Sequence, residues 1–508
     1  MDGQSLVETY ADQIAGVLSC YDRIVITGSV QPLCYAKGMT SYLYRQAIRI
    51  FDYTQFSQPL RDQIRSNAEQ IARQERVSIL HVRRKNERKE AQVEAILKER
   101  GDHPGLVCIL SAMERCGSYE PWHDKASGKT YLRYSDGKCL HYYFYFIDAE
   151  FGLCYLRVPT WCPFRLQFYC NGHAWLANQL KHKQIGYELQ DNGFVSIEDF
   201  ERANALGQEF SAEHLHIKLD EYAKRYCPVI DSLKLSCTWS IMQAEYATDI
   251  VFKQRADLAA IYPHLLETLI YAVKPADIAM FLGKKLHGNY GGEVSSRLSG
   301  VRDMGMRIKH SIGPASIKMY DKFGRILRIE TTITDVSFFQ QYRQVQHRDG
   351  TTESCWAPMK KTIYSLAPLR DTMADANRRY LGLISTFERR DIGVRQLAKL
   401  TEPAIDEQHR YKGFNPLAEE DASLFRVLAR GEFTLSGLTA RALRALLPDK
   451  STSQISRLLK RLRLHGLLKK VGHHYKYYLT EFGRHAIAMV LNLRELHVIP
   501  TLSQAHAA

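Results

Sequence analysis

The hydrophobic and polar positions of the first part of the chain switch between two periods. An amphipathic helix is predicted over residues 4–21, and helices follow at about 40–52 and 56–75. Residues 83–100 predict a helix with charges of both signs that is mostly a solvated face. Between these segments, short apolar runs at 22–29, 77–82 and 105–114 are typical of buried strands. Strands that alternate with helices predict an α/β unit over residues 1–115.

Aromatic residues dominate the next segment, residues 116–230. Leu140–Asp148 and Leu153–Val158 flank a short glycine-containing loop and predict a β-hairpin. A further strand precedes a helix that begins near Asn171, and residues 196–226 have helical periodicity. Aromatic side chains on paired strands can stack against nucleotide bases, but they also favour strands and fill cores. The sequence leaves both interpretations open.

Three strands with alternating faces are predicted within residues 231–400, at 304–311, 315–322 and 325–334. Alternation places a set of charged and aromatic side chains on one face, namely Arg307, Lys309, Lys318, Tyr320, Lys322, Arg328 and Glu330. Phosphate contacts and base stacking require such a mixture of Lys, Arg and Tyr. The competing interpretation is an amphipathic sheet with a solvated basic face and one ion pair at Glu330.

The C-terminal fifth of the chain has the clearest pattern. Residues 401–420 are rich in proline, glycine and charge and predict a linker to a separate domain at 421–499. One helix of this domain carries polar and basic residues opposite its apolar side, namely Ser453, Gln454, Arg457, Lys460, Arg461 and Arg463. Two β-prone segments follow, 467–471 and 475–479, which predict a hairpin with His474 and Lys476 near its tip.

This helix and hairpin resemble the winged-helix domain of MarR-type regulators, with residues 419–430 and 438–446 as the preceding helices. The resemblance implies a recognition helix in the major groove of duplex DNA and a wing that contacts the backbone. No acidic residue interrupts Lys450–Thr480, so its positive field suits DNA. The alternative is a winged helix used for protein contacts.

Two further resemblances lie outside this domain. Residues 319–333, MYDKFGRILRIETTI, resemble a motif of phage and plasmid replication initiators, in which a Tyr-Asp-Lys strand precedes an Arg-x-Glu strand. The chain departs from those initiators because it lacks a metal-binding histidine pair on a strand. Its His214-Leu215-His216 triplet lies in helical sequence, where residues two apart diverge by roughly 200°. The whole chain also resembles an uncharacterised bacterial protein family, from which no activity carries over.

The charge of the chain narrows the class of partner. The 508 residues carry a formal net charge of +14, with a pI near 9.1. This favours a polyanionic partner, although a basic enzyme without such a partner would have the same charge.

The sequence also bears on the location of the protein and on metal binding. No apolar run approaches the roughly 20 residues of a membrane helix, and the N-terminus is unlike a signal peptide, so a cytoplasmic location is expected. The 11 cysteines show no zinc spacing, so neither a structural metal nor a cofactor is expected.

The motifs leave catalysis open. The chain has no GxxxxGK[ST] phosphate loop, no GxGxxG after a strand, no HExxH and no GxSxG. Metal-dependent phosphodiester cleavage requires two or three converging carboxylates, and only this activity would require Mg²⁺. The carboxylates considered are Asp22, Asp148, Glu150, Asp249, Asp321 and Glu330. Asp22, Asp321, Glu330 and Tyr320 are the catalytic candidates, although alternation places Asp321 on the face opposite Tyr320.

The sequence therefore predicts an α+β multidomain protein with an N-terminal α/β unit, a central mixed or antiparallel sheet and a C-terminal winged helix. The expected function is nucleic-acid binding in replication, transposition or another mobile-element process. The winged helix would dock on duplex DNA, and the basic sheet would hold further DNA or RNA. Two alternatives stay open: a metal-dependent phosphodiester nuclease or strand-transferase, and a ligand-responsive transcriptional regulator.

Overall fold

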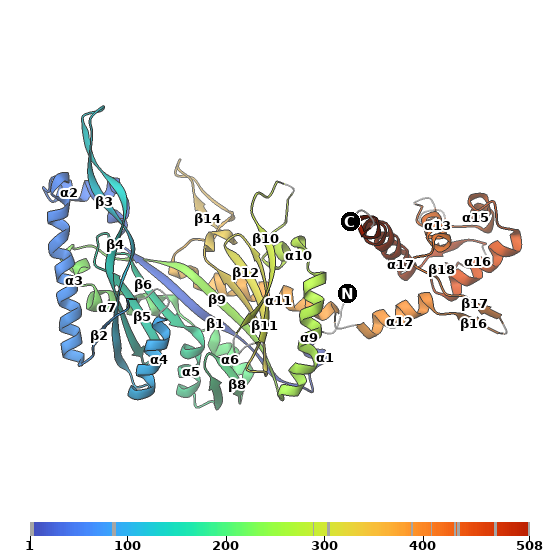
Figure 1. Cartoon of the computed structure of the whole chain (residues 1–508), viewed down its shortest axis with the longest axis horizontal. Helices are drawn as coiled ribbons and strands as arrows, with labels where there is room; N and C mark the ends of the chain where they lie inside the picture. The colour runs from blue at the N-terminus through green and yellow to red at the C-terminus, as the bar shows by residue number, and fades with distance from the viewer. Residues whose placement is uncertain are drawn as a thin grey trace. The chain divides into compact units, whose positions relative to one another are not determined.

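The protein forms two compact units, Met1–Phe387 and Glu388–Ala508 (Figure 1). The structure, a computed structural model, describes residues 5–83, 88–287, 289–301, 305–387, 390–407, 409–430, 433, 437–471 and 475–505. Both units mix helices with strands, and the first is built on one large sheet. A search of the described helices finds none with the length and apolar character to cross a bilayer.

The large sheet of the first unit has 11 described strands in the order β10-β11-β12-β13-β9-β1-β6-β5-β4-β3-β2. Its strands are β1 (Ile14–Ser29), β2 (Ile79–His81), β3 (Gly105–Asp124), β4 (Lys129–Asp148), β5 (Gly152–Pro159), β6 (Leu166–Asn171), β9 (Thr238–Phe252), β10 (Val294–Val301), β11 (Gly305–Ile312), β12 (Ala315–Lys322) and β13 (Ile326–Ile333). The β2–β3 pair is parallel, and the other pairs of this sheet are antiparallel.

Helices cover both faces of this sheet. They are α1 (Leu6–Thr9), α2 (Ala36–Arg45), α3 (Tyr53–Glu75), α4 (Lys89–Arg100), α5 (Gly172–His182), α6 (Phe200–Gly207), α7 (Ala212–Tyr226), α8 (Val229–Ser232), α9 (Arg255–Ala272), α10 (Pro275–Phe281) and α11 (Leu366–Phe387). On one face, Tyr226 of α7 stacks on Phe144 of β4 with ring centroids 4.5 Å apart. Tyr143 precedes Phe144, so it points to the other face, where it packs with Val93 of α4.

Two sequence predictions for the first unit were wrong. The helix expected over residues 4–21 ends at Thr9, and β1 begins at Ile14. The segments expected as separate units, 1–115, 116–230 and 231–400, all contribute strands to the one sheet. Both errors have one cause: β1 pairs with β6 and β9, which lie far away in the sequence. Those pairings bury the apolar residues of β1, which the sequence assigned partly to a helix.

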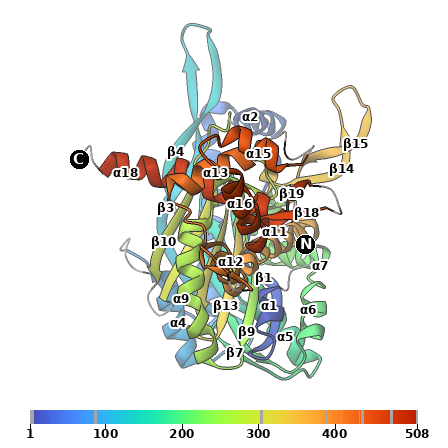
Figure 2. The same cartoon turned by 90° about the vertical axis from the view of Figure 1, so that its right-hand side faces the viewer.

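Shorter hairpins extend from the large sheet. β7 (Tyr187–Gln190) pairs with β8 (Gly193–Ile197), and β14 (Gln340–Gln346) pairs with β15 (Thr352–Pro358). The β14–β15 hairpin and the far ends of β3 and β4 project from the body of this unit as two-stranded ribbons (Figure 2). The strands predicted at 304–311, 315–322 and 325–334 are present as β11, β12 and β13, although residue 304 lies outside the described residues.

The second unit contains the helix and hairpin that the sequence predicted. Its elements are α12 (Arg390–Thr401), β16 (Ala404–Asp406), β17 (His409–Tyr411), α13 (Glu419–Leu428), α15 (Ala440–Leu446), α16 (Thr452–Leu464), β18 (Leu468–Lys470), β19 (Tyr477–Leu479), α17 (Glu481–Asn492), the π-helix η5 (Leu493–Val498) and α18 (Ile499–Ala505). Ser451 and Gln454 form a capping box that fixes the start of α16. The expected linker, 401–420, instead contains β16, β17 and the buried Phe414, which packs in the core of this unit.

Candidate metal centre

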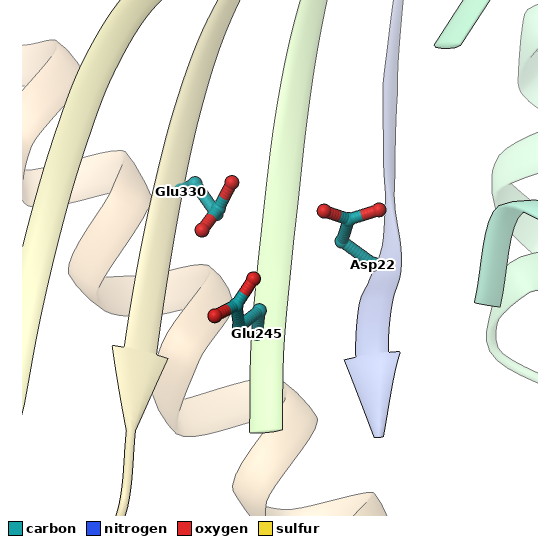
Figure 3. Close-up of side chains that lie close together, drawn as sticks. All are labelled: Asp22, Glu245 and Glu330. Carbon is teal, nitrogen blue, oxygen red and sulfur yellow. The ribbon is translucent and has the colours of Figure 1, made fainter. Parts of the chain in front are cut away.

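Three carboxylates from three neighbouring strands converge on one face of the large sheet. They are Asp22 of β1, Glu245 of β9 and Glu330 of β13 (Figure 3). One carboxylate oxygen from each lies within 4.8 Å of the other two. Asp22 and Glu330 are buried, whereas Glu245 is half-buried, so the group opens to solvent on the Glu245 side.

The strand register explains why these side chains meet. Glu245 lies opposite Arg23 on one side and opposite Thr332 on the other. The β1–β9 register shifts between Tyr21 and Arg23, so Asp22 is the extra residue of a β-bulge, a feature that redirects a side chain. Thr331 hydrogen-bonds Asn377 of α11, so its neighbour Glu330 points to the opposite face.

Glu330 is held by two donors from β12. Tyr320 donates its hydroxyl to Glu330 Oε2 at 2.7 Å, and Lys318 Nζ donates to Oε1 at 2.5 Å. Lys318 Nζ also lies 3.9 Å from Glu245 Oε1, so one ammonium group neutralises part of both carboxylates. Burial and the neighbouring Glu330 carboxylate raise the pKa of Tyr320 well above its usual value. The Tyr320 hydroxyl therefore keeps its proton at neutral pH.

Asp22 is fixed by four polar neighbours. It accepts hydrogen bonds from Asn192 Nδ2 at 2.7 Å and Asn171 Nδ2 at 3.3 Å. His173 Nδ1 lies 3.1 Å and Arg328 3.6 Å from its oxygens. Burial alone would raise the pKa of Asp22, but Arg328 and His173 outweigh burial and hold that pKa well below its usual value. Asp22 is therefore ionised across the physiological pH range.

Glu245 differs from Asp22 because the nearby cations, Lys318 and Arg23, compensate its burial only in part. Burial and the Glu330 carboxylate raise the pKa of Glu245 to about 7, and Lys318 opposes them only in part. A carboxylate must lose its proton before it can bind a metal. Glu245 is therefore the residue of the three that would make metal binding depend on pH near neutrality.

The donor set suits a hard divalent cation. Three carboxylates offer only oxygen ligands, which Mg²⁺, Mn²⁺ and Ca²⁺ prefer over the nitrogen and sulfur ligands that bind zinc. Within the described residues, no other group of three His, Cys, Asp or Glu side chains is close enough to share an ion. The residues present therefore fit Mg²⁺ or Mn²⁺, which could polarise a phosphoryl oxygen at this position.

Two residues expected to contact nucleic acid are instead buried beside this centre, under the β7–β8 hairpin. Arg328 is 0% exposed, and its guanidinium donates to both carboxylate oxygens of Asp249 at 2.6 Å. Lys322 is 1% exposed and donates to the side-chain oxygen of Asn192. Alternation assigned their face correctly, but the β7–β8 hairpin covers that part of the face. Neither side chain is accessible to a phosphate.

The rest of the predicted basic face stays partly open. Across the strands, Arg297 of β10 lies opposite Lys309 of β11, Lys309 opposite Lys318 of β12, and Lys318 opposite Glu330. Arg297 is exposed, whereas Lys309, Lys318 and Arg307 are half-buried. Burial and the neighbouring Lys318 lower the pKa of Lys309. A row of like charges across strands costs stability by itself, so these cations form a surface suited to an anion.

The other acidic and histidine candidates lie apart from the centre. Asp321 faces away from Glu330, and burial raises its pKa. Asp148 accepts a hydrogen bond from Tyr222 at 2.7 Å. His214 contacts Glu150 at 2.6 Å, whereas His216 contacts Tyr364 at 2.6 Å. The two histidines of the triplet thus point to different partners on a helix, as the sequence predicted, and they do not form a metal pair.

The polar side of α16 divides into exposed and buried residues. The exposed residues of α16 are Ser453, Gln454, Arg457, Lys460 and Arg463, and Lys476, between β18 and β19, is also exposed. Lys460 is paired with Asp406. Arg461, which the sequence placed on the DNA-contacting side, is buried and bonds Asp421, Lys412 O and Gly413 O. His474 lies outside the described residues.

Sequence reasoning missed Glu245. The sequence showed a Trp-containing segment at 237–252 but assigned it no strand, so no face could be worked out for its residues. In the structure, this segment is β9, which lies between β1 and β13 and joins the other two carboxylates. Alternating apolar positions in CTWSIMQAEYATDIVF were the signal that could have located this strand.

The chain shows no significant similarity to a protein-family model, to a curated protein or to a solved structure.

Proposed function

We propose that this protein is a divalent-metal-dependent enzyme that cleaves or transfers phosphodiester bonds of nucleic acid. The observation that carries the proposal is the convergence of Asp22, Glu245 and Glu330 within 4.8 Å on one sheet face. Metal-assisted displacement at phosphorus requires a site of this type. The sequence alone made this activity an alternative to binding, and the meeting of the three carboxylates now favours it.

The surroundings of the centre support a nucleic-acid substrate over a small phosphate ester. The basic row of Arg297, Lys309 and Lys318 runs from the edge strand β10 to Glu330 and could hold successive phosphates. Tyr320 lies against Glu330, where its hydroxyl could hold this carboxylate in place. If Tyr320 instead attacks phosphorus, its proton would pass to Glu330, its oxygen would bond to phosphorus, and the bond from phosphorus to the leaving sugar oxygen would break.

The second unit would supply a separate DNA contact. The exposed residues of α16, among them Arg457 and Arg463, form a surface that suits the major groove of duplex DNA. A chain that joins such a surface to a phosphodiester-processing centre suits replication, transposition or another mobile-element process. The substrate of the centre itself could be DNA or RNA.

The experiment is incubation of the purified protein with labelled single- and double-stranded DNA and RNA, with Mg²⁺ or Mn²⁺ and with EDTA. We expect metal-dependent cleavage or strand joining that falls at least about 100-fold in Glu330→Gln and in Asp22→Asn. Asp321→Asn is the matched control, because Asp321 lies on the neighbouring strand but faces away from the centre. Equal activity in the Glu330→Gln variant and the unaltered protein would contradict the proposal.

A second candidate function is nucleic-acid binding without catalysis. The observation that favours it is Lys318, which already neutralises Glu330 and lies near Glu245, as it would in a purely structural ion network. Tight binding of DNA by the unaltered protein, with no change in the DNA under any metal and no metal binding in calorimetry, would support this candidate.

A further inference from the structure

A small cavity lies where β3, β4 and β5 meet the loop between β5 and β6. Its volume is about 130 Å³, and its polar lining comes from Arg115, Cys116, His141, Arg157, Trp161 and Arg165. If each water molecule takes roughly 30 Å³, the cavity holds about four waters. That space suits one tetrahedral oxyanion and is too small for a whole nucleotide.

The charge around this cavity is strongly positive. Three guanidinium groups line it, and a fourth, that of Arg61, stacks over the Trp161 ring 4.7 Å from its centroid. No acidic residue is among the lining residues. Glu114 lies 3.7 Å from Arg157, but its oxygens already accept bonds from Lys89 and Tyr143. Arg157 is half-buried, whereas Arg115 and Arg165 are exposed, and an anion between these like charges would reduce their repulsion.

Buried donors at the cavity lack acceptors. Arg157 Nε, Trp161 Nε1 and Arg61 Nε are all buried, and within the described structure none of the three has a hydrogen-bond partner. Burying an N–H group without an acceptor costs free energy, so such donors are rare unless a ligand or water accepts from them. His141 cannot supply the missing negative charge, and burial and Arg157 lower its pKa to about 4, so it stays neutral.

We infer that this cavity is a phosphate-binding site, in which Arg157, Arg165 and the Trp161 indole N–H hold a phosphate group. A phosphate presents acceptor oxygens in several directions, which matches donors from β5 and from the loop that follows it, and its charge offsets the converging guanidinium groups. The site lies outside the metal centre and shares no residue with it.

The cavity and the metal centre belong to the same face of the sheet. Arg157 of β5 lies opposite Gln167 of β6, and Gln167 lies opposite Thr27 of β1. Arg23, also in β1, lies opposite Glu245 of β9. Residues 23 and 27 of β1 share a face because alternate residues point the same way. From strand spacing and rise, Arg157 lies roughly 10 Å across the strands and about 13 Å along them from Arg23, and β9, the middle strand of the metal centre, lies roughly 5 Å further across.

Stacked aromatic rings occupy the space between the two sites. Tyr155 and Tyr169 stack with centroids 5.2 Å apart and an angle of 12°, and Arg23 lies 5.3 Å from the Tyr169 ring centroid. Both tyrosines are half-buried, so part of each ring faces solvent. This arrangement suits a single strand whose bases pass over the rings. The phosphate in the cavity would then belong to the strand on which the metal centre acts, an assignment that rests on the proposed function.

The first experiment measures binding of inorganic phosphate to the full chain by calorimetry, without divalent metal. We expect the unaltered protein to bind phosphate, Arg157→Gln to weaken binding at least tenfold, and Trp161→Phe to weaken it about threefold. Trp161→Phe removes one N–H and keeps an aromatic ring, so its fold is retained even if Arg157→Gln is unstable. Arg133→Gln is the matched control, because this arginine of β4 is paired with Glu120 away from the cavity. Phosphate that fails to bind, or binds both variants as tightly as the unaltered protein, would overturn the inference.

The second experiment identifies the source of the phosphate. Oligonucleotides of one length, with a 5′-phosphate or a 5′-hydroxyl, are titrated against the unaltered protein and Trp161→Phe. A preference for the 5′-phosphate that the variant loses assigns a terminal phosphate, and equal weakening of both oligonucleotides assigns a backbone phosphate. Weakened inorganic phosphate binding with unchanged oligonucleotide binding would keep the phosphate site and overturn its use for nucleic acid. Repeating the titrations in Glu330→Gln separates this inference from the proposed function, because the cavity does not include Glu330.

Discussion

Arg328 and Asp249 form a two-point ion pair, with Arg328 Nε and a terminal nitrogen each 2.6 Å from an Asp249 oxygen, and neither residue is exposed by more than 1%. The pair lies beside the metal centre on the same sheet face, and Arg328 also approaches Asp22 at 3.6 Å. A residue that sequence alternation assigned to phosphate binding is therefore part of the framework that positions Asp22.

The first prediction concerns that ion pair. Arg328→Met should lower the free energy of unfolding by about 3–5 kcal/mol, because it leaves Asp249 buried without its partner. Chemical denaturation followed by circular dichroism measures this loss. Arg297→Met, at an exposed arginine of the same sheet, should change stability by no more than about 0.5 kcal/mol. Similar stability of the two variants would show that Arg328 is not structural.

The second prediction separates two arginines of α16. Arg461 is buried against Asp421, whereas Arg457 is exposed. Arg461→Gln should therefore unfold the second unit at a lower denaturant concentration. Arg457→Gln should keep its stability and reduce the salt dependence of DNA binding by about one unit in log–log slope. DNA titrations at several salt concentrations test this, and an unchanged slope for Arg457→Gln would reject α16 as the DNA-contacting helix.

The third prediction concerns the pH dependence of metal binding. The pKa of Glu245 is raised to about 7 by burial and by Glu330, so a proton competes with the metal below neutral pH. Mn²⁺ affinity should rise by up to about tenfold per pH unit below pH 7 and level off above it. Calorimetric titrations from acid to alkaline pH measure this rise. In Glu245→Gln, the overall affinity should fall and this part of the pH dependence should disappear.

The same shift predicts a sign for stability in the absence of metal. A carboxyl group whose pKa is raised on folding favours the folded state at low pH, and this contribution is lost as pH rises through about 7. Glu245→Gln should therefore stabilise the metal-free protein at pH 8 by roughly 1–3 kcal/mol and have little effect near pH 4. Urea denaturation of both proteins at the two pH values tests this, and the opposite order would contradict the assigned pKa direction.

The fifth prediction concerns Lys318, which competes with a metal for Glu330. Lys318→Met removes the ammonium group that lies 2.5 Å from Glu330 Oε1, so Mn²⁺ affinity should increase about tenfold. Binding of single-stranded nucleic acid should weaken at the same time, because a phosphate contact is lost. Lys309→Met, one strand further from Glu330, is the control and should leave metal affinity within about twofold. Weaker metal binding in Lys318→Met would show that Lys318 supports the ion.

The sequence by itself determined the local elements. Alternation located β11, β12 and β13 and assigned Glu330 and Asp321 to opposite faces, because side-chain direction on a strand depends only on position along that strand. The apolar side of the helix located α16, and two β-prone segments located the β18–β19 hairpin. These features depend on neighbours within a few residues, which the sequence shows directly.

Only the tertiary structure decided which strands are neighbours and what covers each face. Asp22, Glu245 and Glu330 are separated by long stretches of chain, and they meet because β9 lies between β1 and β13 and because a bulge redirects Asp22. The sequence also could not show which charged side chains are buried. Arg328 and Arg461 are cations of the kind that contact nucleic acid, yet ion pairs with carboxylates from distant segments hold both of them in the interior. Which strands pair and which segments cover a sheet face depend on the whole chain. Periodicity could therefore indicate candidate carboxylates but could not show that they meet.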